Sequence, residues 1–374
     1  MTLSQDRRWW LLIGLFTAVA FALRLIGAKE SPAGDELYLY ELIHHRSFGS
    51  MLNAVIHQEK TPPLGFALSW GAAHMPPADL WMRAPSVLAG TALVPVTALL
   101  ARRVFGAPAG LAAGAIVAVS PFLLFYGAEA RAYSLAALLV TGSALAVLKA
   151  TQPEGRTRDW VFFSILAVSA ALTHYTTVFA LGAIVVWAFV SHPTARRQLG
   201  QAVGAAGLVF VAWVPSFLTQ FGHASDEARR IADQAPLSVE TLGRMLGRAS
   251  IGHPFLGLSE IPRALAIGLI LAGLLRAGIP AIVALAKAGR PLPRPRPGVA
   301  LVLLLAVVTL LGLIVSSLQP NRSLLLTRNL MASIPAWAIL AGSLTARPRW
   351  PVNLITAGAV VAGLGIGSYL ELTQ

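Results

Sequence analysis

The chain has 374 residues, of which 56% are hydrophobic and only 12% charged, and its mean hydropathy is +0.68. Because a soluble domain carries about 25% charged residues, this composition excludes an ordinary soluble fold and predicts a polytopic membrane protein. The net charge of +13 does not indicate nucleic-acid binding, since the basic residues lie in short clusters between apolar runs. The absence of cysteine excludes disulfides, a thiol nucleophile and a thiolate metal site.

The apolar runs predict an all-α protein with a single domain over residues 1–374. A spanning helix needs ~20 apolar residues, and this length predicts about eleven spans. The first, Trp9 to Gly27, lacks a small-residue cleavage pattern and is expected to be retained. The spans are expected at 9–27, 80–101, 108–127, 131–149, 160–174, 175–191, 200–221, 261–285, 298–318, 330–345 and 350–370.

The loops predict the orientation of these spans. Arginine and lysine recur in alternate loops along the whole chain, which places those loops and the N-terminus in the cytoplasm. The composition suggests a bacterial inner or plasma membrane protein. The outer segments are then 28–79, 222–260, 319–329 and a tight turn near Gly127–Arg131.

Two short helices are expected within the first outer loop, 28–79. One runs from Asp35 to Arg46, and the other covers 62–75 and is opened by Pro62 and Pro63. Both are too short to span, so we expect them to lie in the plane of the membrane interface.

Ionisable residues at membrane depth are costly, and they are candidates for a functional site. Carboxylates suit proton abstraction or metal binding, whereas guanidinium groups match the oxygens of a phosphate. Their convergence on one face predicts a site for a phosphate-linked substrate at the outer interface. The candidates on that side are Asp35, Glu36, Glu59, Lys60, Arg83, Glu129, Arg131, Tyr133, His174, Tyr175, Arg322 and Arg328.

Each candidate also has a purely structural interpretation. Asp35 is consistent with a helix N-cap, and Arg83, like Arg24, with a side chain that snorkels to the headgroups. Glu129 and Arg131 are consistent with a structural salt bridge. His174 fits a hydrogen-bonded interface histidine, and the Arg and His residues of 222–260 fit a solvated loop face.

Several motifs occur in an order that resembles the GT-C membrane glycosyltransferases, in the branch of protein O-mannosyltransferases and the lipid A aminoarabinose transferase. Asp35-Glu36 follows the first span, Pro62-Pro63-Leu64 opens a short helix, and Leu80-Trp81-Met82-Arg83-Ala84-Pro85-Ser86 enters the next span. Glu129-Ala130-Arg131-Ala132-Tyr133 and Thr327-Arg328-Asn329-Leu330 before Pro335 fit the same branch.

The resemblance implies an inverting transfer of a hexose or pentose from a polyprenyl phosphate to a hydroxyl of a lipid, glycan or protein on the outer face. Asp35 is implied as the general base, with Glu36 as its neighbour or as its partner in a divalent metal site, which is left open. Arg131, Arg328 and Lys60 are implied to bind the donor phosphate. The remaining substrate-binding candidates are Arg83, Glu129, Tyr133 and His174.

Three other readings stay open. A transporter or flippase of a lipid-linked sugar would need ionisable residues in mid-bilayer and an inverted repeat, neither of which is found in the sequence. A non-catalytic assembly partner would tolerate replacement of Asp35 and Glu36. A polymer ligase would take its glycan from a polyprenyl pyrophosphate.

Overall fold

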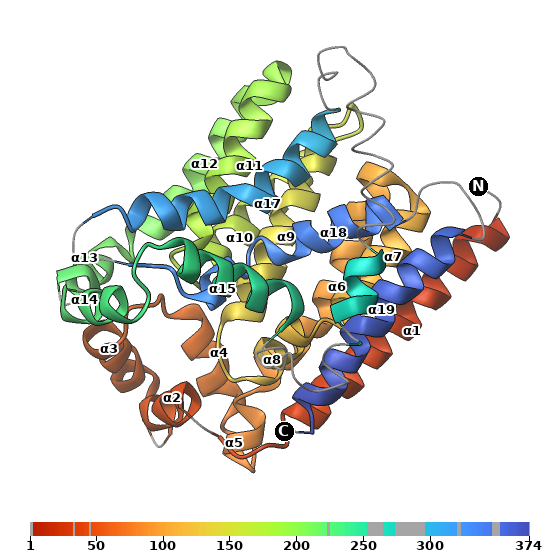
Figure 1. Cartoon of the computed structure of the whole chain (residues 1–374). Helices are drawn as coiled ribbons and strands as arrows, with labels where there is room; N and C mark the ends of the chain where they lie inside the picture. The colour runs from red at the N-terminus through yellow and green to blue at the C-terminus, as the bar shows by residue number, and fades with distance from the viewer. Residues whose placement is uncertain are drawn as a thin grey trace.

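The computed structural model describes residues 3–32, 34–44, 46–222, 225–252, 265, 267–273, 296–319, 323–345 and 352–373. Within these ranges every regular element is a helix, which confirms the all-α prediction (Figure 1). The elements are α1 (Leu3–Gly27), α2 (Asp35–Ile43), α3 (Phe48–Gln58), α4 (Leu64–Ala72), α5 (Ala78–Trp81), α6 (Ala84–Phe105), α7 (Ala107–Ala118), α8 (Pro121–Ala128), α9 (Tyr133–Ala150), α10 (Thr157–Ala171), α11 (Thr177–Ser191), η1 (Pro193–Ala195), α12 (Arg196–Val211), α13 (Val214–Gly222), α14 (Ser225–Gln234), α15 (Val239–Ile251), α17 (Pro297–Ser316), η3 (Thr327–Leu330), α18 (Ile334–Thr345) and α19 (Val352–Glu371).

The helices α6 and α7 form a tight hairpin at the centre of the bundle. A single residue, Gly106, joins them with φ of 97°, a left-handed conformation that favours glycine. Small residues let the neighbouring backbones approach closely, because a Cβ on Gly342 of α18 would lie 2.8 Å from the amide nitrogen of Ala113 on α7. Close packing of small residues therefore replaces large apolar side chains in this part of the core.

Four helices are long and apolar enough to cross a membrane, or six if each of two bent pairs counts as one span. This finding covers the described residues only and does not confirm the predicted eleven. The predicted span 108–127 is bent by 56° between α7 and α8, where Ser120 caps the new helix and Pro121 begins it. The predicted span 200–221 is likewise two helices, α12 and α13. Pro215 cannot donate a hydrogen bond back to Val211, so the first helix ends there.

Three further predictions have different outcomes. The segment 28–79 contains the two expected short helices, α2 and α4, and a third, α3, that was not predicted. The predicted span 261–285 lies outside the described residues, apart from 265 and 267–273. Arg322 also lies outside them.

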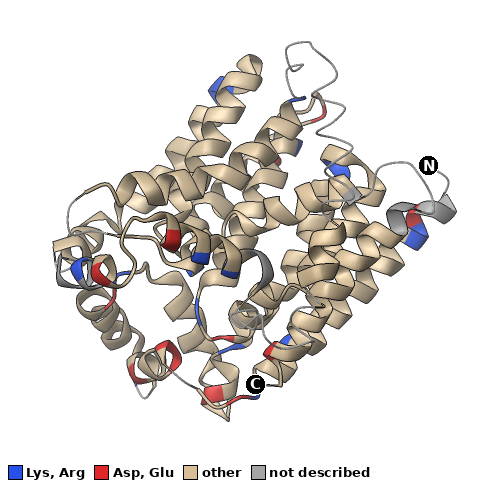
Figure 2. Ribbon diagram, viewed as in Figure 1, with Lys and Arg blue, Asp and Glu red and all other residues tan. Residues whose placement is uncertain are grey.

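The short helices α2, α3 and α4 are held to the bundle by a small apolar cluster of their own. Leu39 and Leu42 of α2, Met51 and Val55 of α3 and Phe66 of α4 are buried together. Charged residues are sparse over the helical body and gather around α2–α5, around α14–α15 and at helix ends (Figure 2).

Candidate active site

Asp35 is the first residue of α2, and its carboxylate faces two arginines. Its Oδ2 accepts a hydrogen bond of 2.7 Å from Nη1 of Arg328, which belongs to η3. The Nη2 of Arg131, in the turn between α8 and α9, lies 3.7 Å from the same oxygen. The N-cap of α2 is Gly34, with φ of 50°, so the interpretation of Asp35 as an N-cap is wrong. The Asp35 side chain is 39% exposed and is therefore accessible to a ligand.

Glu36 has a different environment, because the adjacent position on a helix points about 100° away. Its Oε1 and Oε2 accept hydrogen bonds of 2.7 and 2.6 Å from Nε and Nη2 of Arg83, and Oε1 also accepts from the amide of Ala130 at 2.7 Å. Arg83 is 4% exposed and also donates to the carbonyl of Ala28. The interpretation of Arg83 as a snorkelling side chain is therefore wrong.

Arg131 links two carboxylates. Besides Asp35 it contacts Glu59, whose Oε1 lies 3.3 Å from Nη1. Glu59 is only 6% exposed, and its other oxygen faces the amide of Lys60 and the hydroxyl of Thr61, both at 3.4 Å. Arg131 thus pairs with Glu59 and Asp35 rather than with Glu129, which corrects the interpretation as a Glu129–Arg131 salt bridge. Lys60 lies beside this pair on the loop after α3.

Tyr133 and His174 form the aromatic side of the site. The guanidinium carbon of Arg328 lies 5.8 Å from the centre of the Tyr133 ring, and the His174 ring lies 5.5 Å from the same ring. Burial, with smaller effects from Arg131 and Arg328, lowers the pKa of His174 to about 4. His174 is therefore neutral at pH 7, and its Nδ1 lies 2.8 Å from the hydroxyl of Thr176.

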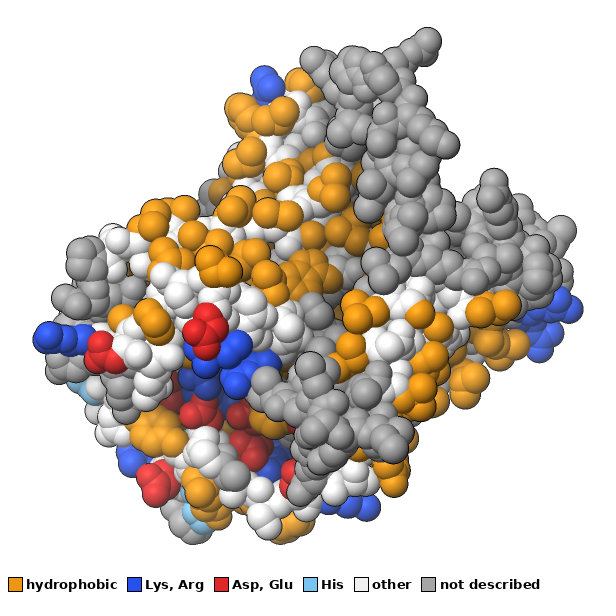
Figure 3. Space-filling model, in the orientation of Figure 1, with side chains coloured by type: hydrophobic (Ala, Val, Ile, Leu, Met, Phe, Trp, Pro, Cys, Tyr) orange, Lys and Arg blue, Asp and Glu red, His pale blue; other side chains and the backbone are white. Residues whose placement is uncertain are grey.

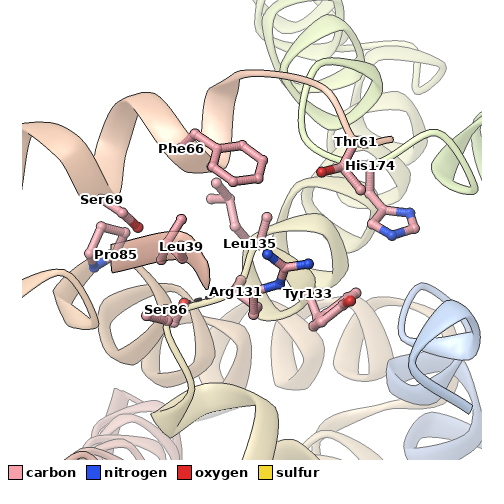
Figure 4. Close-up of a pocket in the computed structure, with 13 residues that line it drawn as sticks. Leu39, Thr61, Phe66, Ser69, Pro85, Ser86, Arg131, Tyr133, Leu135 and His174 are labelled. Carbon is pink, nitrogen blue, oxygen red and sulfur yellow. Dashed lines mark hydrogen bonds between the residues drawn. The ribbon is translucent and has the colours of Figure 1, made fainter. Parts of the chain in front are cut away.

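Arg131, Tyr133 and His174 line a small cavity of about 20 Å³, which is room for a water molecule. Figure 4 shows the Arg131 guanidinium pointing into it between Phe66 and Tyr133, with His174 beside them. On the surface, acidic and basic side chains gather in one hollow below the position of α15 (Figure 3). The site is thus a charged hollow in an otherwise apolar molecule.

Glu129, the C-cap of α8, lies near this hollow with one oxygen unsatisfied. Its Oε2 is buried and has no hydrogen-bond partner. Burial raises the pKa of Glu129 to about 7; the Arg131 guanidinium opposes this rise, and the carboxylates of Glu36 and Asp35 add to it. Glu129 therefore changes its charge near neutral pH.

The structure also identifies a buried glutamine that the sequence did not. Gln220, near the end of α13, is 2% exposed and donates from Nε2 to the carbonyls of Val55 and Thr61, both at 3.0 Å. Its Oε1 accepts from the hydroxyl of Tyr175, which in turn accepts from the indole of Trp213 at 3.0 Å. This chain of hydrogen bonds fixes the loop that carries Glu59. An amide at the end of an apolar run was the only signal in the sequence.

No group of three or more His, Asp or Glu side chains suited to a metal ion occurs among the described residues. Both oxygens of Glu36 are already occupied by Arg83. The donor set therefore does not fit a metal shared by Asp35 and Glu36.

Several solved structures are similar to this chain. ArnT from Cupriavidus metallidurans, bound to undecaprenyl phosphate, aligns with a TM-score of 0.59 and 16% identity, over 96% of this chain and 76% of that chain. AglB, an oligosaccharyltransferase from Archaeoglobus fulgidus, in complex with an inhibitory peptide and a dolichol-phosphate, aligns with a TM-score of 0.59 and 13% identity. All of this chain is covered, but only 56% of AglB.

The chain has the GT-C fold. The resemblance seen in the sequence is thereby confirmed for the architecture of this multi-pass membrane protein. The sequence model of the dolichyl-phosphate-mannose-protein mannosyltransferase family matches residues 60–218, which include Arg83, Arg131 and His174. A search of curated protein sequences gave no significant match.

Proposed function

We propose that this GT-C protein transfers a sugar from a polyprenyl phosphate to a hydroxyl acceptor at the outer face of the membrane, with inversion at the anomeric carbon. The observation that carries the proposal is that Arg131 and Arg328 both face Asp35. Guanidinium groups bind phosphate in the same way as carboxylate, so a donor phosphate can occupy the place that the Asp35 carboxylate takes here. The GT-C fold and the lipid phosphate bound to ArnT support this class of donor.

In the proposed reaction, the donor phosphate draws Arg131 and Arg328 away from Asp35 and leaves its carboxylate free to act as a base. Asp35 takes the proton of the acceptor hydroxyl while that oxygen forms a bond to the anomeric carbon. The bond from this carbon to the phosphate oxygen breaks, and the polyprenyl phosphate leaves with the electron pair. The two arginines, with Lys60 beside them, stabilise the charge that develops on it.

The other candidates have supporting roles. Because Glu36 and Arg83 are buried and paired with each other, we assign them to holding α2 in place. Tyr133 and His174 would line the sugar side of the donor, since a neutral imidazole and a phenol suit hydroxyl groups. Glu129 would add a further carboxyl beside the reacting centre.

The test uses the purified full-length protein in lipid vesicles and a panel of radiolabelled polyprenyl-phosphate sugars. Transfer of label from one of them to a hydroxyl acceptor is expected, and Asp35→Asn should abolish it. Glu41→Gln is the matched control, because Glu41 is an exposed carboxylate on the same helix. Full activity in Asp35→Asn would remove Asp35 as the base. Movement of an uncleaved donor across the bilayer would instead favour a flippase.

A further inference from the structure

A second cavity lies at the other end of α2. It has a volume of about 460 Å³ and is lined by Ile43, His44, Arg46, Ser47, Trp70, Ala73 and His74. None of these residues lines the cavity that contains Arg131. Asp35 begins α2 and His44 is its C-cap. At 1.5 Å per residue, the nine residues of this helix separate the two sites by about 13 Å.

Arg46 gives this cavity a fixed positive charge. Its Nε donates to the carbonyl of Glu41 at 3.3 Å, which holds the side chain in place. Among the described residues no acceptor faces either of its Nη groups, so both remain available to a ligand. A guanidinium group with two free Nη groups is suited to a carboxylate or a phosphate.

The start of α3 adds to the positive potential at the rim. Ser47 lines the cavity and is the N-cap of α3, where its hydroxyl accepts from the amide of Ser50 at 3.2 Å. The remaining amides of the first turn have no acceptor within the helix. They carry a partial positive charge that favours an anion.

Trp70 and His74 provide groups that suit a saccharide. The Nδ1 of His74 lies 2.8 Å from the carbonyl of Trp70, and because a carbonyl only accepts, Nδ1 carries the proton. The Nε2 of a neutral His74 is then an acceptor for a hydroxyl group. The indole of Trp70, held by a hydrogen bond of 2.8 Å to the carbonyl of Arg46, supplies an apolar surface.

We propose that this cavity binds an anionic saccharide, with its phosphate or carboxylate on Arg46 and the α3 N-terminus and its hydroxyls on His74. Under the proposed function it would hold the acceptor at a point about one helix length from Asp35. Only this acceptor role rests on the proposed function, since the anion site follows from its own residues. The same chemistry would accept the phosphate of an anionic lipid headgroup.

The test measures binding of radiolabelled hexose 6-phosphate to the full-length protein in nanodiscs of a zwitterionic lipid. Two equivalents are expected, one at Arg46 and one at the arginines of the active site. Arg46→Gln and Arg328→Gln should each remove one equivalent, and His74→Gln should weaken the Arg46-dependent equivalent about tenfold or more. Arg103→Gln, an exposed arginine at the end of α6, is the control and should change neither.

Unchanged stoichiometry in Arg46→Gln, with a Tm within a few degrees of wild type, would overturn the proposal. Loss of the Arg46-dependent equivalent in nanodiscs that contain phosphatidylglycerol would support the site and identify a lipid headgroup as the occupant. Persistence of the Arg46-dependent equivalent in these nanodiscs would support a saccharide as the occupant. If the wild-type protein binds both equivalents but transfers no sugar from any donor of the panel to a hydroxyl acceptor, the proposed function fails while this site stands.

Discussion

Arg328 donates a hydrogen bond of 2.7 Å from Nη1 to Oδ2 of Asp35, across 293 positions of the chain. This contact joins the first residue of α2 to η3, near the opposite end of the sequence. In the proposed reaction the same guanidinium exchanges the carboxylate for the donor phosphate.

Replacing Arg328 by alanine is therefore expected to weaken donor binding and to slow transfer. A preorganised charge at a developing anion contributes about 10² to 10³ in rate. The donor KM and kcat can be measured with a polyprenyl-phosphate sugar over a range of concentrations. Arg197→Ala, on the exposed face of α12, is the control. If kcat and the donor KM both stay at their wild-type values, Arg328 does not belong to the site.

The Glu36–Arg83 pair is expected to act on stability more than on chemistry. The two side chains are 8% and 5% exposed, so Glu36→Gln leaves a buried guanidinium without its counter-charge. Removing one partner of such a pair costs about 3–5 kcal/mol. We expect a clear fall in Tm in detergent, partly recovered in the double variant Glu36→Leu with Arg83→Met. A variant of wild-type Tm that had lost all transfer activity would show that Glu36 acts in the reaction itself.

Gln220 is expected to affect the site indirectly, through the loop after α3. Gln220→Leu leaves the buried carbonyls of Val55 and Thr61 without a donor, at a cost of about 1–3 kcal/mol. Glu59 then holds Arg131 less firmly, so the donor KM should rise more than kcat falls. Tyr175→Phe should give a smaller change in the same direction, because it removes only the hydroxyl that donates to Gln220. The control is Gln201→Leu, an exposed glutamine on α12, and equal effects of the two leucine variants would refute the positioning role.

The raised pKa of Glu129, about 7, predicts a pH-dependent stability. The unfolded carboxyl ionises near its ordinary value of 4.5, whereas the folded one stays protonated until about pH 7. The stability that Glu129 contributes is therefore fully present below pH 4.5 and is lost as the pH rises through about 7.

Glu129→Gln, which cannot ionise, removes this dependence. We expect the Tm of the variant to rise relative to wild type between pH 5 and pH 8, when both are measured in the same detergent. A Tm difference that stays constant over this range would mean that the carboxyl does not titrate there.

Much of the architecture follows from the sequence alone. The apolar runs predicted a helical membrane protein, and the proline at the start of α4 predicted a short helix there. The scarcity of charge drew attention to Asp35, Arg131 and Arg328, and the structure brings these three side chains together. These features are local, because helix length, helix breaking and the cost of an ionisable group in lipid depend on composition and nearby residues.

The different surroundings of Asp35 and Glu36 depended on tertiary structure. Both are carboxylates at the start of one helix, and only the position of Arg83 against the buried face of α2 makes Glu36 a structural partner. The role of Gln220 likewise depended on α13 lying against the loop after α3, 159 positions earlier in the chain. The sequence determines which groups are costly to bury. The packing of distant helices determines which partner each of these groups meets, because hydrogen bonds and ion pairs need atoms within about 3–4 Å.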